Sequence, residues 1–450
     1  MLKLPRLLVP LALLAAALPS QASEPVLASL KDFTEAEVRS QGFHLARPTR
    51  VHVYGRGGAL EYKGDPGSLY AYGWILDAAT RQVVWQMQPG TVQKAGRYRI
   101  ADQYLDLPAG SYEIHFANHA YAQRSFFSRW ERNIDRRQQP RERPALWQSF
   151  LGISPARLRK TWAQEAQQFG LEIYDASPDP RPVATFTPPL AWRGEVVSLR
   201  ASGDGEQLTQ AFRCTRPVAF QVYAQGEGES GGRLHDQGWI LDARTRKRVW
   251  SLDRAKPGWG GGARKNLRVM DRITLPAGDY LATYTTDDSH SPADWNAAPP
   301  WDPSKYGLVL AVAAEPDAQA VTLLNASDLE GKVVAELVGL KHYERRSADF
   351  TLAAPSSVRV FAMGERTDGD WQDWGWIEDA QGKVVWTLEG QDGDPAGGSR
   401  KNRLVEAVIP LPKGSYVVHY RMDGSHGPSS WNSTPPRNPE RYGITVYLMK

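Results

Sequence analysis

One ordered set of landmarks occurs three times along the sequence, and this repeat constrains the fold more than any other feature. A Phe-led segment precedes a Gly-Trp-Ile triplet, a second tryptophan ten or eleven positions later, and a Leu-Pro-x-Gly turn before a tyrosine. The first copy has Phe43, Trp74, Trp85, Pro108 and Tyr112; the second has Phe212, Trp239, Trp250, Pro276 and Tyr280; the third has Phe350, Trp376, Trp386, Pro412 and Tyr416. Five landmarks in one order indicate three copies of a single structural unit.

Each copy has the signature of short β-strands. The segments 51–53 and 358–360 alternate apolar and polar residues, as half-buried strands do. The segment 238–250 is typical of a hairpin around a polar turn. Asp242 stands where strand becomes turn, as do Asp77 and Asp379, and these three side chains are expected to cap the turns. A unit of about 120 residues with seven or eight such strands predicts a β-sandwich of the jelly-roll or immunoglobulin-like kind. Both tryptophan series are expected to anchor its core.

The landmarks predict an all-β chain of three tandem modules behind a targeting segment. Residues 1–22 have a basic start, a short apolar run and a small-residue end, which predicts a secretory signal peptide. We expect module 1 at 24–175, a Pro-rich linker at 176–193, module 2 at 194–313, a second linker at 314–330 and module 3 at 331–450. No later stretch has about 18 consecutive apolar residues, so no transmembrane segment is expected. The signal predicts a periplasmic or secreted protein.

The order of features resembles the pre-peptidase C-terminal type of β-sandwich found in secreted bacterial proteins. The resemblance rests on the Phe-x-Leu opening strand, the hairpin, and the strand pair around aliphatic-Pro-x-Gly-x-Tyr, and it covers about two-thirds of each module. It implies an accessory or interaction module rather than a catalytic one. The tryptophans and the His-containing loops of modules 2 and 3 are not part of that pattern.

Modules 2 and 3 share a second set of residues that module 1 lacks, and we call these segments the His loops (residues 286–307 and 422–443). The residues predicted to bind a ligand are Asp287, Ser289, His290, Trp295 and Asn296 in module 2, and Asp423, Ser425, His426, Trp431 and Asn432 in module 3. Two basic pairs, Arg264-Lys265 and Arg400-Lys401, are candidate contacts for an anion.

Several interpretations of the His loops stay open at this level. An exposed Trp could stack on a sugar ring while Asn, Asp and Ser bind its hydroxyls. Oxygen ligands could hold Ca²⁺, although module 3 retains few of them, and no EF-hand or zinc spacing is present. Catalysis by Ser289 and His290 is disfavoured because neighbours on an extended segment point to opposite sides. The remaining interpretation is structural: these side chains satisfy the loop's own backbone, and Trp closes it onto the sandwich.

Module 1 carries an insertion at 124–169 instead. Ser154-Pro155 is a helix start, and Leu158, Trp162, Ala166 and Phe169 are at helical spacing after it. Residues 124–160 contain ten Arg or Lys and three Asp or Glu, interleaved with aromatic residues. Such a segment could meet an anionic surface. The formal charge of the whole chain is only +4, and export argues against a nucleic-acid partner.

These observations predict a non-catalytic binding or scaffolding protein of the cell envelope. In this hypothesis the equivalent His loops of modules 2 and 3 bind an envelope or extracellular polysaccharide, with no cofactor. One alternative is a hydrolase with a His and carboxylate site between modules. Another is a purely structural envelope protein. Cys214 is the only cysteine, so no internal disulfide is possible.

Overall fold

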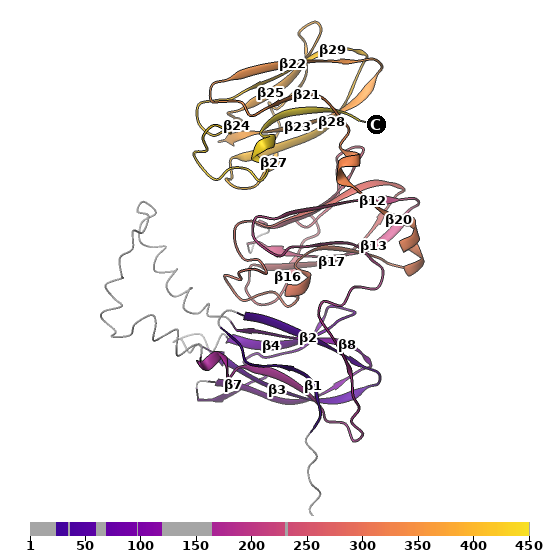
Figure 1. Cartoon of the computed structure of the whole chain (residues 1–450), viewed down its shortest axis with the longest axis vertical. Coiled ribbons are helices and arrows are strands. Elements are labelled where there is room, and N and C mark those ends of the chain that lie inside the picture. The colour runs from indigo at the N-terminus through magenta and orange to yellow at the C-terminus, as the bar shows by residue number, and fades with distance from the viewer. Residues whose placement is uncertain are drawn as a thin grey trace, which may run out of the picture.

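The computed structural model describes residues 24–34, 37–59, 69–96, 98–118, 164–229 and 233–449. Three β-sandwiches succeed one another along a rod, each sheet antiparallel, which confirms the predicted all-β fold of tandem modules (Figure 1). Nearly all of the predicted helical insertion lies outside the described residues. Within them, no helix is both long and apolar enough for a membrane span.

The three modules share one succession of strands, to which module 3 adds the short β24. Module 1 comprises β1 (Val26–Leu30), β2 (Glu37–Leu45), β3 (Thr49–Ala59), β4 (Leu69–Asp77), β5 (Val83–Gln86), β6 (Gln93–Ala95), β7 (Tyr98–Leu107), β8 (Gly110–Asn118) and β9 (Gly170–Asp175), and β10 (Ala184–Phe186) comes after it. Module 2 comprises β11 (Glu195–Arg200), β12 (Gln207–Cys214), β13 (Val218–Glu227), β14 (Gln237–Asp242), β15 (Arg248–Ser251), β16 (Gly258–Trp259), β17 (Asn266–Leu275), β18 (Gly278–Thr285), η1 (Pro303–Lys305) and β19 (Gly307–Val312); η2 (Glu315–Ala320), β20 (Val321–Leu324) and η3 (Ala326–Leu329) come after it. Module 3 comprises β21 (Lys332–Val338), β22 (Arg345–Leu352), β23 (Ser356–Thr367), β24 (Asp370–Trp371), β25 (Trp374–Asp379), β26 (Val384–Thr387), β27 (Asp394–Pro395), β28 (Asn402–Leu411), β29 (Gly414–Arg421), η4 (Pro439–Arg441) and β30 (Gly443–Leu448).

One layer of each sandwich contains the Gly-Trp-Ile strand, and we call it the Trp sheet. Its order is β5-β4-β8-β2-β10 in module 1, β15-β14-β18-β12-β20 in module 2 and β26-β25-β29-β22 in module 3. The opposite layers are built around β3, β13 and β23. In module 1, β3 also pairs with β4, so the two layers join into one ten-stranded sheet.

The shared landmarks form the cores. Phe43, Phe212 and Phe350 stack on Tyr112, Tyr280 and Tyr416, with ring centroids 5.6, 5.5 and 5.2 Å apart. Each tyrosine hydroxyl donates to the carbonyl of the proline four residues earlier, which ties the Leu-Pro-x-Gly turn to the strand after it. Trp85, Trp250 and Trp386 are buried in the cores as predicted.

The other tryptophan series lies on the outer face of the Trp sheet, so the prediction that it anchors the core is wrong. Ile75, Ile240 and Ile377 are fully buried inside the sandwiches. Their neighbours Trp74, Trp239 and Trp376 therefore point away, because successive side chains alternate across a strand. The prediction failed because Gly-Trp-Ile contains two large apolar residues and does not say which of them faces the core.

The predicted turn-capping aspartates are confirmed. Asp77 Oδ1 accepts the backbone N–H groups of Ala79 and Thr80, at 2.9 and 2.8 Å. Asp242 and Asp379 accept N–H groups in the equivalent hairpin turns. Cys214 is buried, and burial raises the pKa of its thiol to about 11, so it is unreactive at neutral pH.

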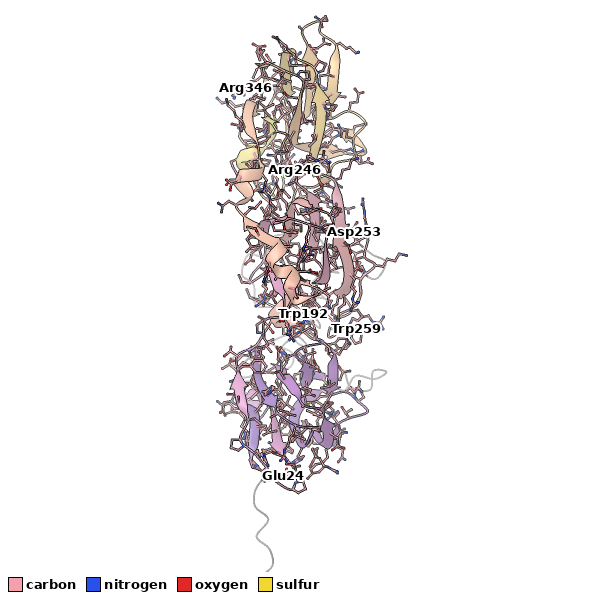
Figure 2. The ribbon with its side chains drawn as sticks, turned by 90° about the vertical axis from the view of Figure 1, so that its right-hand side faces the viewer. Glu24, Trp192, Arg246, Asp253, Trp259 and Arg346 are labelled. Atoms are coloured by element: carbon pink, nitrogen blue, oxygen red, sulfur yellow. The ribbon has the colours of Figure 1, made fainter. Side chains whose placement is uncertain are left out.

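Modules 1 and 2 are joined by a fully buried cluster of charges. The hairpin turn of module 1 places Arg81 against Glu113 of its own module and Asp302 of module 2, and all three side chains have no exposed surface. Four charge-assisted hydrogen bonds of 2.6 to 2.8 Å hold the guanidinium. Trp74 Nε1 also donates to the Trp301 carbonyl at 2.6 Å, and Trp192 lies at this junction (Figure 2). These contacts fix the first two modules in one orientation.

The second junction repeats this arrangement with different partners. Arg246 occupies the position of Arg81 in the module 2 hairpin, with a φ of 56° against 57°. It donates to the Leu329 carbonyl at 2.7 Å and lies 3.8 Å from Glu406 of module 3 (Figure 2). Arg437 of module 3 donates to the Thr286 carbonyl of module 2 at 2.5 Å. At both junctions the Trp sheet of one module therefore faces the opposite layer of the next module.

Candidate functional sites

The His loop of module 2 closes on a buried network. His290 has no exposed surface; its Nδ1 lies 3.0 Å from Asn296 Oδ1 and its Nε2 2.5 Å from Asn266 Oδ1. The Asn266 amide donates to the carbonyls of Gly261 and Ala298, at 2.7 and 2.8 Å. Lys265 reaches into the same network and donates to Glu227 at 2.8 Å. The His290 ring thus joins Asn296 of the His loop to Asn266, the first residue of β17.

Module 3 builds the same network with equivalent residues. His426 also has no exposed surface, and its ring nitrogens lie 3.0 Å from Asn432 Oδ1 and 2.6 Å from Asn402 Oδ1. Lys401 donates to Glu365 at 2.9 Å, and Asn402 donates to the Thr434 carbonyl at 3.0 Å. The histidine and its two asparagines have the same spacing in both modules, so one network explains why the loop sequence occurs twice.

Beneath each His loop lies a buried carboxylate. Both oxygens of Asp236 are occupied: they accept from the backbone N–H of Glu227 at 2.8 Å, the N–H of Asp287 at 3.0 Å and the Tyr306 hydroxyl. Burial raises the pKa of Asp236 to about 7 and that of Asp287 to about 6. Asp373 holds the equivalent place in module 3, and burial raises its pKa to about 6.

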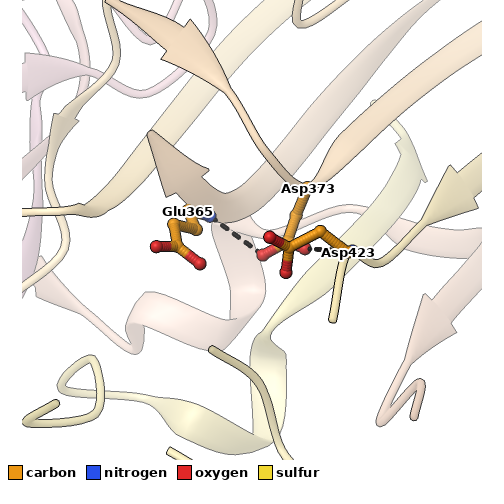
Figure 3. Close-up of side chains that lie close together, drawn as sticks. All are labelled: Glu365, Asp373 and Asp423. Carbon is orange, nitrogen blue, oxygen red and sulfur yellow. Dashed lines mark hydrogen bonds between the residues drawn. The ribbon is translucent and has the colours of Figure 1, made fainter. Parts of the chain in front are cut away.

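Among the described residues, one group of acidic side chains has the spacing of a metal site: one carboxylate oxygen each from Glu365, Asp373 and Asp423 lie within 4.8 Å of one another (Figure 3). Their oxygens already accept protein hydrogen bonds. Asp373 accepts from the Glu365 and Asp423 N–H groups and the Tyr442 hydroxyl, and Glu365 accepts from Lys401 and Ser425. These hydrogen bonds give the three carboxylates a structural role in holding the His loop of module 3. The Ca²⁺ site considered from the sequence stays a prediction.

The residues predicted to bind a ligand in the His loops fall into inward and outward sets. His290, His426 and Trp295 are buried; Trp295 retains 7% exposure, with its ring edge-on to His290 at 4.9 Å and to Tyr306 at 5.1 Å. Trp431 is half-buried, as are Asp287, Ser289, Asn296, Asp423 and Ser425, while Asn432 is exposed. Ligand stacking on Trp295 would require the loop to open. The ligand-binding role of these loops therefore stays a prediction.

The candidate anion contacts divide in the same way. Arg264 and Arg400 are exposed, whereas Lys265 and Lys401 turn inward to Glu227 and Glu365. The hydrolase alternative needs a histidine and carboxylates from two modules in one accessible cleft. His115, Glu113 and Asp302 do meet at the first junction, but none has any exposed surface. Burial raises the pKa of Glu113, but the His115 ring 3.4 Å away and the hydrogen bonds from Arg81 outweigh burial and lower it to about 2.

The outer face of the Trp sheet, which the sequence did not single out, is covered in modules 1 and 2. In module 1, Trp74 is 1% exposed and packs with Leu76 and with Trp301 of module 2. In module 2, Leu241 and Leu281 lie beneath Leu324 and Leu329 of the next segment. Segments that follow module 1 thus bury this face there, whereas in module 2 they cover Leu241 and Leu281 and leave Trp239 half-buried beside them.

In module 3 no described segment covers the same face. Trp374 and Trp376 project from β25 and are half-buried, and Val384 on β26 is 48% exposed. The Trp376 ring stacks on His419 at 4.7 Å, with the Arg345 guanidinium 5.0 Å from its centroid. Arg421 lies 4.6 Å from the Trp374 ring centroid. We call Trp374, Trp376, His419, Arg345 and Arg421 the aromatic platform. In Figure 1 its sheet lies at the end of the rod farthest from module 1.

Comparison with known proteins does not assign the chain to a family. No family model matches it, and no curated protein matches it. Among solved structures, it has 11% identity and a TM-score of 0.17 to the tandem CBM51 modules of a family 98 glycoside hydrolase from Streptococcus pneumoniae, over 55% of this chain and 82% of that one. A second match, to the entire lipid-containing bacteriophage PM2, has 10% identity and a TM-score of 0.14, over 94% of this chain and 99% of that one. These scores are too low to bear on fold or function. The pre-peptidase C-terminal resemblance finds no counterpart among these matches.

Proposed function

We propose that this chain is a non-catalytic, exported scaffolding protein of the cell envelope that binds a polysaccharide through the aromatic platform of module 3. The observation that supports this is that no described segment packs over the Trp sheet of module 3, whereas Trp301 packs over that of module 1 and Leu324 and Leu329 pack over that of module 2. Two tryptophans with partly exposed rings on one rigid strand give an apolar surface suited to the C–H faces of sugars. The buried junctions hold that surface at one end of the rod.

Two arginines at the platform favour an acidic polysaccharide, and the Glu378 carboxylate, which contacts the platform, already accepts the Trp376 indole N–H at 2.8 Å. Arg345 and Arg421 are directly opposite each other on β22 and β29, and Trp374 is opposite Arg421 on β25. A guanidinium pairs with a carboxylate through two parallel hydrogen bonds, which gives orientation as well as attraction. We therefore expect uronic acid units to bind better than neutral sugars, with affinity that falls as salt rises.

Titration of the full chain with a uronic acid polymer and with a neutral glucan tests this proposal. Trp376→Ala should weaken binding of the acidic polymer about tenfold or more. Trp239→Ala is the matched control, because it removes an equally half-buried tryptophan at the equivalent strand position of module 2, beside the linker residues Leu324 and Leu329, and it should leave binding unchanged. Equal binding by the wild type and Trp376→Ala, or no binding of either polymer, would refute the platform.

The same titration tests the His loops predicted from the sequence. Trp431 is the half-buried member of the tryptophan pair, and Asn432 beside it is exposed. If the loops bind the polymer, Trp431→Ala weakens binding while Trp376→Ala does not. If the platform binds it, the two variants give the opposite result.

A further inference from the structure

In modules 1 and 2, the segment after the last strand adds a strand to the Trp sheet. β10 pairs with β2 and β20 pairs with β12, both antiparallel. Eight residues separate β9 from β10 (176–183), and eight separate β19 from β20 (313–320). The same edge of the sheet is thus closed in the same way twice.

The two added strands share a register. Phe186 stands opposite Gly42, and Leu324 stands opposite Ala211. Counted from the landmark phenylalanines Phe43 and Phe212, Gly42 and Ala211 are equivalent positions. A side chain at Gly42 would meet the Phe186 ring at 2.3 Å. The small residue on the sheet makes room for the large residue on the added strand.

In module 3 the equivalent edge is β22, and no described residue pairs with its outer side. The Gly42 and Ala211 position is occupied there by Asp349, which is exposed. In module 2 the Thr215 N–H donates to the Ala320 carbonyl on the added segment at 2.9 Å. Since every second residue of a strand presents its backbone groups to the same side, Arg213 and Ala211 face that edge too. Their counterparts Thr351 and Asp349 therefore present N–H and C=O groups at the open edge of β22.

We propose that the β22 edge of module 3 receives an extended segment of a partner protein, with a basic residue opposite Asp349. Backbone hydrogen bonds to β22 would supply affinity, and the pair across the strands would supply selectivity. In modules 1 and 2, Phe186 and Leu324 stand opposite the small residues Gly42 and Ala211. Asp349 has a carboxylate at the same position, so we expect the partner to place a Lys or Arg opposite it. A second copy of β22 paired antiparallel about Ser347 would also place a basic residue, Arg345, opposite Asp349, so a dimer of the chain is one outcome that the experiment must separate from partner binding.

Peptide binding to the full chain tests this proposal. One fluorescent peptide has the sequence of residues 319–326, which contains β20, and the second is the same peptide carrying Leu324→Lys. The Lys peptide should bind wild type about two- to fivefold more tightly than the parent peptide. Asp349→Ala, which copies module 2, should remove or reverse that preference.

Thr351→Pro should abolish binding of both peptides, because proline removes a donor from the open edge. Edge strands tolerate proline where the N–H faces solvent, so module 3 should keep its thermal midpoint. Trp376→Ala should leave peptide binding intact, which separates this proposal from the polysaccharide platform. Three results would overturn it: no binding of the Lys peptide at millimolar concentration, binding that survives Thr351→Pro, or a concentration-dependent dimer of the chain that Thr351→Pro dissolves.

Discussion

Replacing Arg81 with methionine should destabilise the first junction more than any single change to its partners. The substitution keeps an unbranched apolar stem but leaves Glu113 and Asp302 facing each other with no exposed surface. Asp302→Asn leaves the Arg81 and Glu113 pair intact. Removing one member of a buried ion pair costs about 3 to 5 kcal/mol, most of it for the charge left unpaired. We therefore expect about 4 kcal/mol for Arg81→Met and about half of that for Asp302→Asn.

The acid limb of the stability curve tests the same reasoning in wild type. The folded pKa of Glu113, about 2, lies below its ordinary value of 4.5. Its contribution is therefore present above pH 4.5 and lost as pH falls toward 2, and it amounts to about 3 kcal/mol. In Arg81→Met the sign reverses: the two unpaired carboxylates take up protons on folding, so the variant gains stability as pH falls from neutral toward 4.

Urea unfolding followed by tryptophan fluorescence, between pH 3 and pH 8, measures both effects. A triple variant with Arg81→Met, Glu113→Gln and Asp302→Asn should recover part of the loss, since it leaves no buried charge. Small-angle scattering of Arg81→Met should show a more variable angle between modules 1 and 2. A loss below about 1 kcal/mol that is the same at every pH would refute the assignment of this cluster as the lock of the junction.

Three further changes probe the loops and sheets. His290→Ala should destabilise module 2 by about 2 to 4 kcal/mol in calorimetry, because it leaves the amide groups of Asn266 and Asn296 without this partner. The neighbouring change Ser289→Ala should cost less than about 1 kcal/mol, and equal costs would contradict the network. The contribution of Asp236 to the free energy of unfolding should fall by up to about 4 kcal/mol as pH rises from 4 to 7, because its folded pKa of about 7 exceeds the unfolded value. Asp236→Asn should flatten this dependence of stability on pH, and an unchanged dependence would exclude Asp236 as its source. Trp250→Ala should cost about 3 to 5 kcal/mol and Trp376→Ala much less, and a reversed order would contradict the assignment of core and outer face.

The His loops show how far sequence reasoning reached at the candidate sites. Identical spacing in two copies marked Ser289, His290, Trp295 and Asn296 as candidate ligand-binding residues, and the structure places His290, Trp295 and Asn296 in contact with one another. Residue types alone could not distinguish a loop that binds a ligand from one that binds itself, because both need the same donors and acceptors. Burial divides the set: His290 and His426 have no exposed surface, whereas Asn432 is exposed.

The aromatic platform was missed for a related reason. Trp376 occurs in a triplet shared by all three modules, so the repeat marked it as scaffold. Whether Trp74, Trp239 or Trp376 meets solvent depends on which segment packs over the outer face of its module. Trp301 packs over this face in module 1, and Leu324 and Leu329 pack over it in module 2. All three residues are far along the sequence from the tryptophan of the face that they contact.

Local patterns in the chain were sufficient for the three-module β architecture and the turn-capping aspartates, because strand alternation, turn chemistry and core aromatics recur at each landmark. The burial of each Trp sheet's outer face and the locking of the modules could be seen only after folding. Arg81, Glu113 and Asp302 are separated by up to 221 residues, and nothing local marks them as partners until folding brings their charges out of water together.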